Sequence, residues 1–268
     1  MRIFYLIKKI LKTIFFSLKF FLSFKNGEAL LVSLPRSGTH LTFGLLNICY
    51  SMKLGYQGKL GIADSGYSAY AKLQMPFDER SIFHKYSKLN LWHSHLPFSK
   101  IVPQRKYFCK TLILIREPVE GIKSFVLHAL NANEEETYLS SEISLQVFLK
   151  LNSKYNFINH YVSFLESWKN RKQKNLDLKI EIIDHKILKK NILGYLKFVN
   201  SFFRFEFSEE QMLKAVSELD INKISKASSI KSIRFSKNKI NFSKEVDKFI
   251  SDKCEKPYLE ILKYSNNK

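Results

Sequence analysis

The sequence predicts an α/β fold in which a mainly parallel central sheet is covered by helices on both faces. Short apolar runs lie at 29–34 and 111–115, and such runs are typical of parallel strands buried on both faces; a further strand is predicted over 178–183. A helical periodicity of apolar residues follows each run, and strands that alternate with helices form parallel sheets. Ligands of such sheets bind at the carboxyl ends of the strands. The residues that follow each strand are therefore the candidate site residues.

The first strand leads into a loop of small residues and then into a helical pattern. The loop is Pro35-Arg36-Ser37-Gly38-Thr39. A strand, a small-residue loop and a helix N-terminus together direct backbone N–H groups at an anion. Arg36 adds a fixed positive charge, and Ser37 and Thr39 add hydroxyl donors. The Gly-Lys-Ser/Thr ending of nucleotide triphosphatase loops is absent. We therefore predict an anion-binding loop of another kind.

A second strand is predicted over 89–95, and it carries two histidines. Because side chains alternate along a strand, His93 and His95 are expected on the same side of the sheet. A pair of histidines two residues apart is also compatible with metal binding. No third ligand or glutamate follows at a usable spacing, so we expect no metal site.

The strand over 110–116 places a second cation at its carboxyl end. This cation is Arg116, and Pro118 then occupies the favoured first position of a helix. Ser124 lies two turns into that helix, on a different face from the apolar Ile122. We therefore expect Arg116 and Ser124 to converge on one anion.

The remaining chain predicts one long helix over 141–170, a strand that ends at Asp184-His185, and two further helices. The second of these helices begins at Ser208 with capping-box spacing. Residues 54–70 show little periodicity and are predicted as a loop. Residues 221–244 carry Lys and Arg and no acid. They are either a basic loop that closes over an anionic ligand or a solvated loop without a role.

Composition limits the class of protein. The chain has 268 residues, 45% of them hydrophobic, which is ample for one α/β domain with an appendage. A net charge of +20 is compatible with anionic small molecules, glycans, a membrane or nucleic acid, but also with compositional drift. No nucleic-acid-binding signature is present, so we do not expect a nucleic-acid partner. Three widely spaced cysteines fit a reducing compartment and predict a cytoplasmic protein.

The first 25 residues are predicted to form a unit separate from the domain at 26–268. Over 2–24, apolar residues share one helical face and lysines lie largely on the other. The lysines interrupt every apolar run, which argues against a spanning helix. No small-residue cleavage site follows, which argues against a signal peptide. We favour a basic amphipathic helix on the inner face of the cell membrane. The alternative is a helix packed on the domain itself.

Three stretches together resemble the sulfotransferase family, which transfers a sulfuryl group from 3′-phosphoadenosine 5′-phosphosulfate (PAPS) to an acceptor. Residues 34–39 resemble the family's 5′-phosphosulfate loop, and 115–118 with Ser124 resemble its 3′-phosphate site. Between them, 93–97 resemble the Lys-Thr-His-Leu-Pro stretch that carries the catalytic histidine. Weaker similarities lie at 183–185 and 229–234, so the resemblance covers about residues 28–235.

The resemblance implies a P-loop-type three-layer fold, PAPS as the donor, and in-line transfer to an acceptor hydroxyl, with no metal required. The acceptor would be a saccharide, a lipid or another alcohol. His95 would be the general base, with Arg36 and His93 on the transferred group. The implied donor-binding residues are Pro35, Arg36, Ser37, Gly38, Thr39 and His40 for the 5′-phosphosulfate, and Arg116, Ser124 and Arg234 for the 3′-phosphate.

The chain departs from the family pattern at three positions. Leu41 and Ile230 stand where aromatic residues that pack on adenine are common, and His93 stands where a lysine is common. Two other functions remain open at this point. One is a P-loop small-molecule kinase, which the missing Gly-Lys-Ser/Thr disfavours. The other is a non-catalytic basic protein that binds anions, glycans or membranes, which does not account for the pairing of Arg116 with Ser124.

Overall fold

The computed structural model describes residues 28–54, 67–72, 81–86, 91–95, 97, 108–132, 142–173, 179–219 and 241–265. The predicted amphipathic helix over 2–24 lies outside the described residues, and so do Ile230, Arg234 and most of the basic stretch 221–244. Within the described part of the chain, no helix is long and apolar enough to cross a membrane.

The centre of the molecule is a six-stranded sheet in the order β2-β3-β4-β1-β5-β6. Its strands are β1 (Glu28–Ser33), β2 (Tyr67–Lys72), β3 (Ser81–Tyr86), β4 (Leu91–Ser94), β5 (Phe108–Ile115) and β6 (Lys179–Asp184). Strands β4, β1, β5 and β6 are parallel, which confirms the predicted mainly parallel sheet. Strands β3 and β2 extend it in antiparallel pairing.

The apolar runs of the parallel strands bury alternate residues on opposite faces of the sheet. In β1, Leu30 and Val32 join the core on one face, whereas Leu31 joins the core on the other. The same alternation divides β5, where Ile113 belongs to the first core and Leu112 to the second. All five side chains are at most 1% exposed. A strand buried on both faces must be apolar throughout, which is the pattern seen in the sequence.

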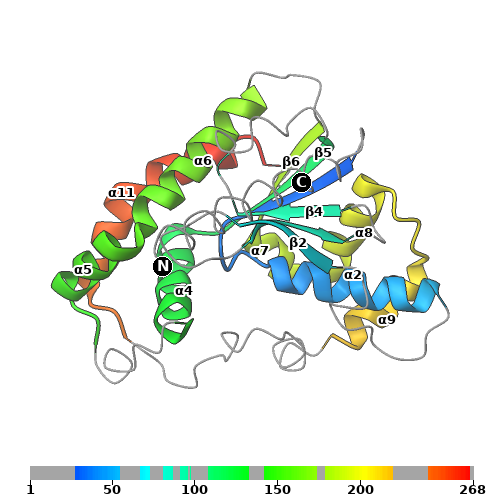
Figure 1. The fold of residues 1–268 in the computed structure, drawn as a ribbon, viewed down its shortest axis with the longest axis horizontal. Coiled ribbons are helices and arrows are strands. Elements are labelled where there is room, and N and C mark those ends of the chain that lie inside the picture. Colours follow the sequence, from blue (N-terminus) through cyan, green and yellow to red (C-terminus); the bar gives the residue numbers. More distant parts are fainter. Residues whose placement is uncertain are drawn as a thin grey trace, which may run out of the picture.

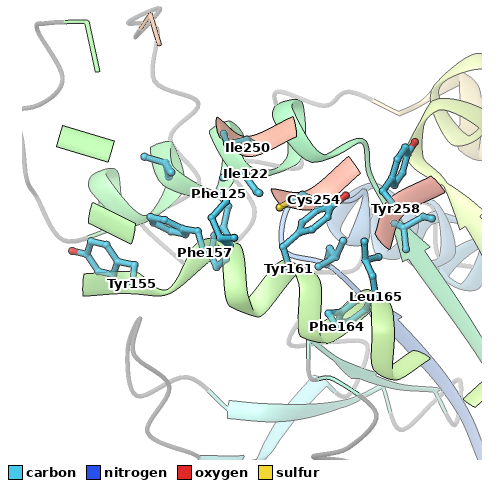
Figure 2. Packing of buried hydrophobic residues seen from close by; sticks show 14 of the residues in the cluster. Ile122, Phe125, Tyr155, Phe157, Tyr161, Phe164, Leu165, Ile250, Cys254 and Tyr258 are labelled. Atoms are coloured by element: carbon cyan, nitrogen blue, oxygen red, sulfur yellow. The ribbon is translucent and has the colours of Figure 1, made fainter. Parts of the chain in front are cut away.

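Helices α4 (Pro118–Ala132), α5 (Leu145–Tyr155), α6 (Phe157–Gln173) and α11 (Lys244–Leu262) cover one face of the sheet (Figure 1). Figure 2 shows how this layer packs. Phe157 and Tyr161 of α6 point toward Phe125 of α4 and toward Cys254 of α11. The rings of Phe125 and Phe157 meet edge to face at 5.0 Å between centroids, a favourable geometry for aromatic pairs.

The other face is covered by α2 (Thr39–Lys53), α8 (Ile192–Phe203) and α9 (Glu209–Ser217), which lie across the sheet from α6 and α11 (Figure 1). The short helix α7 (His185–Lys190) follows β6 directly. Ser208 and Gln211 form the reciprocal bonds of a capping box at the start of α9, as the sequence predicts. The three-layer α/β fold is therefore confirmed.

The helix predicted over 141–170 is two helices. Asn156 ends α5 in the left-handed conformation, with φ of 58°, and α6 begins at the next residue. Asparagine tolerates this conformation better than most residues, so the break leaves the helical periodicity on both sides intact. Within the described segment 179–219, three helices rather than the predicted two follow β6, because Asn191 ends α7 and caps α8. The segment predicted as a loop over 54–70 includes the start of β2 at Tyr67.

The register of the parallel strands brings four strand ends to one edge of the sheet. Val32 of β1 lies opposite Ser94 of β4, and Ser33 lies opposite Leu114 of β5. Ile115 of β5 in turn lies opposite Asp184 of β6. The segments that follow these strands therefore meet at the same edge, where the fold class places ligands.

Candidate functional site

The loop after β1 has two residues in the left-handed region. Arg36 has φ of 68° and Gly38 has φ of 100°. A Cβ atom on Gly38 would lie 2.8 Å from Leu188 Cδ1 and 3.3 Å from His185 Cδ2. Both the backbone angle and the space therefore require glycine at position 38.

The loop ends as the N-terminus of α2. Gly38 is the N-cap residue and offers no side chain to the first N–H groups of the helix. These groups have no partner within the helix itself, and the helix dipole makes this end positive. The Ser37 hydroxyl is buried and has no hydrogen-bond partner among the described residues. A buried polar atom without a partner destabilises the free protein and favours a ligand that can accept its hydrogen bond.

Two arginines and a serine connect the loop to the end of β5. Arg116 Nη1 donates to the Arg36 carbonyl over 3.0 Å, and Arg36 Nε donates to Ser124 Oγ over 3.3 Å. Burial and, next, the neighbouring Arg116 charge lower the pKa of the Arg36 guanidinium. Two close cations repel each other in the free protein, so an anion between them would relieve this cost. The structure thus brings together the predicted Arg36, Arg116 and Ser124.

Arg116 is itself held from two sides. Its Nη2 lies 3.2 Å from Glu120 Oε2, and the Tyr161 hydroxyl donates to its carbonyl over 2.6 Å. Its Nε is buried and has no partner among the described residues. The guanidinium therefore keeps an unused donor on a fixed backbone, a geometry suited to an anion.

Ser33, the last residue of β1, joins the loop to both histidines. Its hydroxyl lies 2.6 Å from Thr39 Oγ1, 3.2 Å from His93 Nε2 and 3.2 Å from His95 Nδ1. His93 is buried, with its ring edge-on to Phe43 at 5.4 Å between centroids. His95 is half-buried, and its ring lies 4.5 Å from that of His93. The predicted histidine pair therefore lies beside the loop, on the same side of the sheet.

The Ser33 carbonyl determines which nitrogen of His95 carries the proton. His95 Nδ1 lies 2.8 Å from this carbonyl, which can only accept a hydrogen bond. Nδ1 therefore carries the proton in the neutral ring, and the basic lone pair is on Nε2. In this tautomer Nε2 is free of the proton and can accept one. Ser33 was not singled out by the sequence, because a serine at the end of a buried strand carries no signal of its own.

His185 is a second residue that sequence reasoning left without a role. It begins α7 beside Gly38, and its Nδ1 is buried without a partner among the described residues. Burial, followed by the charges of Arg116 and Lys189, lowers the pKa of this imidazole to about 4, with Glu120 acting in the opposite direction. His185 is therefore neutral at pH 7, and a protonated ring there would face two cations.

The other predicted site residues lie as follows. Pro35 is half-buried in the loop, and His40 is exposed in the first turn of α2. Arg234 lies outside the described residues. No cluster of three or more histidine, cysteine, aspartate or glutamate side chains suitable for a metal occurs in the described part of the chain.

Comparisons with known proteins bear on the domain and its fold. Residues 26–259 match the family model of the sulfotransferase domain. The fold resembles the crystal structure of mouse sulfotransferase SULT7A1 complexed with PAP, with a TM-score of 0.52 and 17% sequence identity. The alignment covers 90% of this chain and 86% of the mouse chain. No match was found among curated proteins.

The lowered pKa of His185 makes folding stability depend on pH. The unfolded chain binds a proton near the ordinary histidine pKa of about 6.5, whereas the folded chain binds it only near pH 4. Between these values the unfolded state holds more protons, so stability falls as pH falls, by up to about 1.4 kcal/mol per pH unit. His185→Gln removes this contribution. Urea unfolding at neutral and mildly acidic pH should show a smaller loss of stability in His185→Gln. Equal losses of stability in the wild type and in His185→Gln would show that the pKa of His185 is not lowered in the folded protein.

Proposed function

The chain belongs to the sulfotransferase domain family. From this premise we propose that it transfers the sulfuryl group of PAPS to a saccharide or lipid hydroxyl, with His95 as general base. The observation that carries the proposal is the hydrogen bond from His95 Nδ1 to the Ser33 carbonyl, beside the anion-binding loop. This bond leaves the basic Nε2 of an oriented imidazole next to the place where the donor is expected.

The residues of the site fit a donor with two anionic ends. The N-terminus of α2, the unpartnered Ser37 hydroxyl and Arg36 suit a 5′-phosphosulfate. Arg116, through its unused Nε, and Ser124 suit a 3′-phosphate. The remaining residues assigned to the donor from the family resemblance are Pro35, Gly38, Thr39, His40 and Arg234. PAPS supplies the activated sulfuryl group when it is bound there.

The reaction needs a base for the acceptor hydroxyl and donors for the developing charge. An imidazole suits the first need near neutral pH, because its ordinary pKa lies close to the working pH. His95 Nε2 would accept the hydroxyl proton while Nδ1 keeps its bond to Ser33. Arg36, on the bridging oxygen, and the N–H groups of the loop would stabilise the negative charge that builds up on the leaving oxygen.

The proposed class of acceptor rests on the amino-terminal sequence. A basic amphipathic helix over 2–24 would hold the domain at 26–268 against an anionic membrane surface, where lipid and envelope saccharide hydroxyls are concentrated. Labelled sulfate transfer from PAPS over lipid and glycan extracts tests this assignment. We expect label in a lipid or saccharide product. Transfer to small soluble phenols alone would contradict it.

His95→Asn removes the basic nitrogen but keeps a donor for the hydrogen bond to the Ser33 carbonyl. The asparagine amide N–H can replace Nδ1–H in the bond to the Ser33 carbonyl, but asparagine has no basic nitrogen. We expect turnover to fall by roughly a hundredfold or more, as in His95→Ala, because general base catalysis contributes this much. The affinity for 3′-phosphoadenosine 5′-phosphate (PAP), measured by calorimetry, should change little in both variants. Wild-type turnover in His95→Asn would remove His95 from the role of base.

Arg116→Ala tests the site for the 3′-phosphate. Loss of a charged hydrogen-bond donor should weaken PAP binding roughly 10- to 100-fold, which corresponds to about 1.5–3 kcal/mol. Glu120→Gln is the matched control, because it removes the ion pair with Arg116 but leaves the guanidinium in place. We expect it to bind PAP at least as tightly as the wild type. Unchanged affinity in Arg116→Ala would contradict the assignment.

A further inference from the structure

The hydroxyl of Ser33 lies where three functional side chains meet. Ser33 is fully buried at the carboxyl end of the central strand β1, between β4 and β5. The shortest of its side-chain contacts is the one to Thr39 Oγ1, at 2.6 Å, and those to His93 and His95 are both 3.2 Å. A buried hydroxyl has one proton and two lone pairs, so these contacts cannot be independent of one another.

Counting donors and acceptors limits the possible arrangements. His95 Nδ1–H is directed mainly to the Ser33 carbonyl, the closer of its two acceptors. The Ser33 hydroxyl therefore mainly joins His93 to Thr39. It can donate to one of them and accept from the other, and the Thr39 contact has the length of a good O–H···O hydrogen bond.

A bound anion determines in which direction the hydrogen bonds between His93, Ser33 and Thr39 run. An anionic oxygen at the loop can only accept, so the Thr39 hydroxyl must donate to it. Thr39 then accepts from Ser33, and Ser33 accepts from His93 Nε2–H. We propose that Ser33 is a positioning residue, which connects His93 to Thr39 in a hydrogen-bond relay that orients the Thr39 hydroxyl toward the 5′-phosphosulfate end of the donor. This inference rests on the proposed function and assigns new roles to Ser33 and His93.

The burial of His93 explains why the relay is needed. His93 is 4% exposed, and its Nε2 is directed at Ser33. An imidazole in this place acts on the donor through two hydroxyls, whereas the lysine common here in the family carries its own charge. Hydrogen bonds in a chain polarise one another in a site of low dielectric, so the relay strengthens the Thr39 donor.

The same serine also serves the base. Its carbonyl fixes the tautomer of His95, while its hydroxyl orients Thr39. The two functions use different atoms, so a substitution can separate them. Ser33→Ala removes the hydroxyl and retains the carbonyl that holds His95.

A double-mutant cycle between Ser33 and Thr39 tests the relay. Ser33→Ala and Thr39→Val should each weaken PAP binding about five- to tenfold, as expected for a lost hydrogen bond. The double variant should bind no more weakly than Thr39→Val alone, because both changes interrupt one chain. Thr39→Ser keeps a hydroxyl and is the matched control, with affinity close to the wild type. Additive losses in the double variant would overturn the relay, as would wild-type affinity in Ser33→Ala.

A nitrogen NMR measurement on the full wild-type chain tests the relay without depending on the folding of a variant. Addition of PAP to the wild type should shift the His93 Nε2 resonance toward that of a stronger hydrogen-bond donor. Ser33→Ala should abolish this shift of the His93 resonance. If Ser33 had only a structural role, the shift would persist in Ser33→Ala. An unchanged His93 resonance in the wild type under saturating PAP would overturn the proposal. If the wild type does not bind PAP, the proposed function is contradicted as well. If the wild type binds PAP and the losses of affinity in Ser33→Ala and Thr39→Val are additive, the relay alone is contradicted.

Discussion

The parallel pairing of β4, β1, β5 and β6 is the constraint on which the site depends. Because these strands run in one direction, their carboxyl ends lie at a single edge of the sheet, and each delivers one functional group there. Strand β1 delivers the loop and Ser33, β4 delivers His95, β5 delivers Arg116, and β6 delivers His185. The two hydrophobic cores hold this register, since a slip by one residue would exchange the side chains of a strand between two close-packed cores.

Electrostatics then decides what the assembled edge can bind. Burial and, next, the nearby Arg116 charge lower the pKa of Arg36, and His185 remains neutral beside Arg116 and Lys189. Glu120 pairs with Arg116 from the exposed side. The free protein thus maintains positive charge in a partly buried place, at a cost in stability. Such a site is preorganised for an anion, because its charges need not move when the ligand binds.

Much of this site could be predicted from the sequence, for identifiable reasons. Apolar runs predicted β1 and β5, β6 was predicted from the residues over 178–183, and the proline at position 118 marked the start of α4. Knowledge that parallel strand ends share an edge was then enough to pair Arg116 with the loop. Their actual connection, in which Arg36 lies between Arg116 and Ser124, requires coordinates.

The features that were missed have physical reasons. Strands β2 and β3 mix polar and aromatic residues, and such outer strands lack the continuous apolar run of a strand buried on both faces. The break between α5 and α6 depends on one residue in a left-handed conformation, which leaves helical periodicity unchanged. Ser33 and His185 gain their importance only from side chains brought next to them by the fold. Periodicity and motif spacing do not report such contacts.

We expect this edge of the sheet to bind a nucleotide with phosphate groups at both its 3′ and 5′ positions, in contrast to the 5′-diphosphate of a kinase product. Thermal unfolding of the full chain with PAP, and separately with ADP and magnesium, tests it most directly. A ligand that binds only the folded state raises the melting temperature, and at equal concentration the ligand with the higher affinity raises it more. The account predicts an increase of several degrees with PAP and little change with ADP. A larger increase with ADP, or none with either nucleotide, would contradict it.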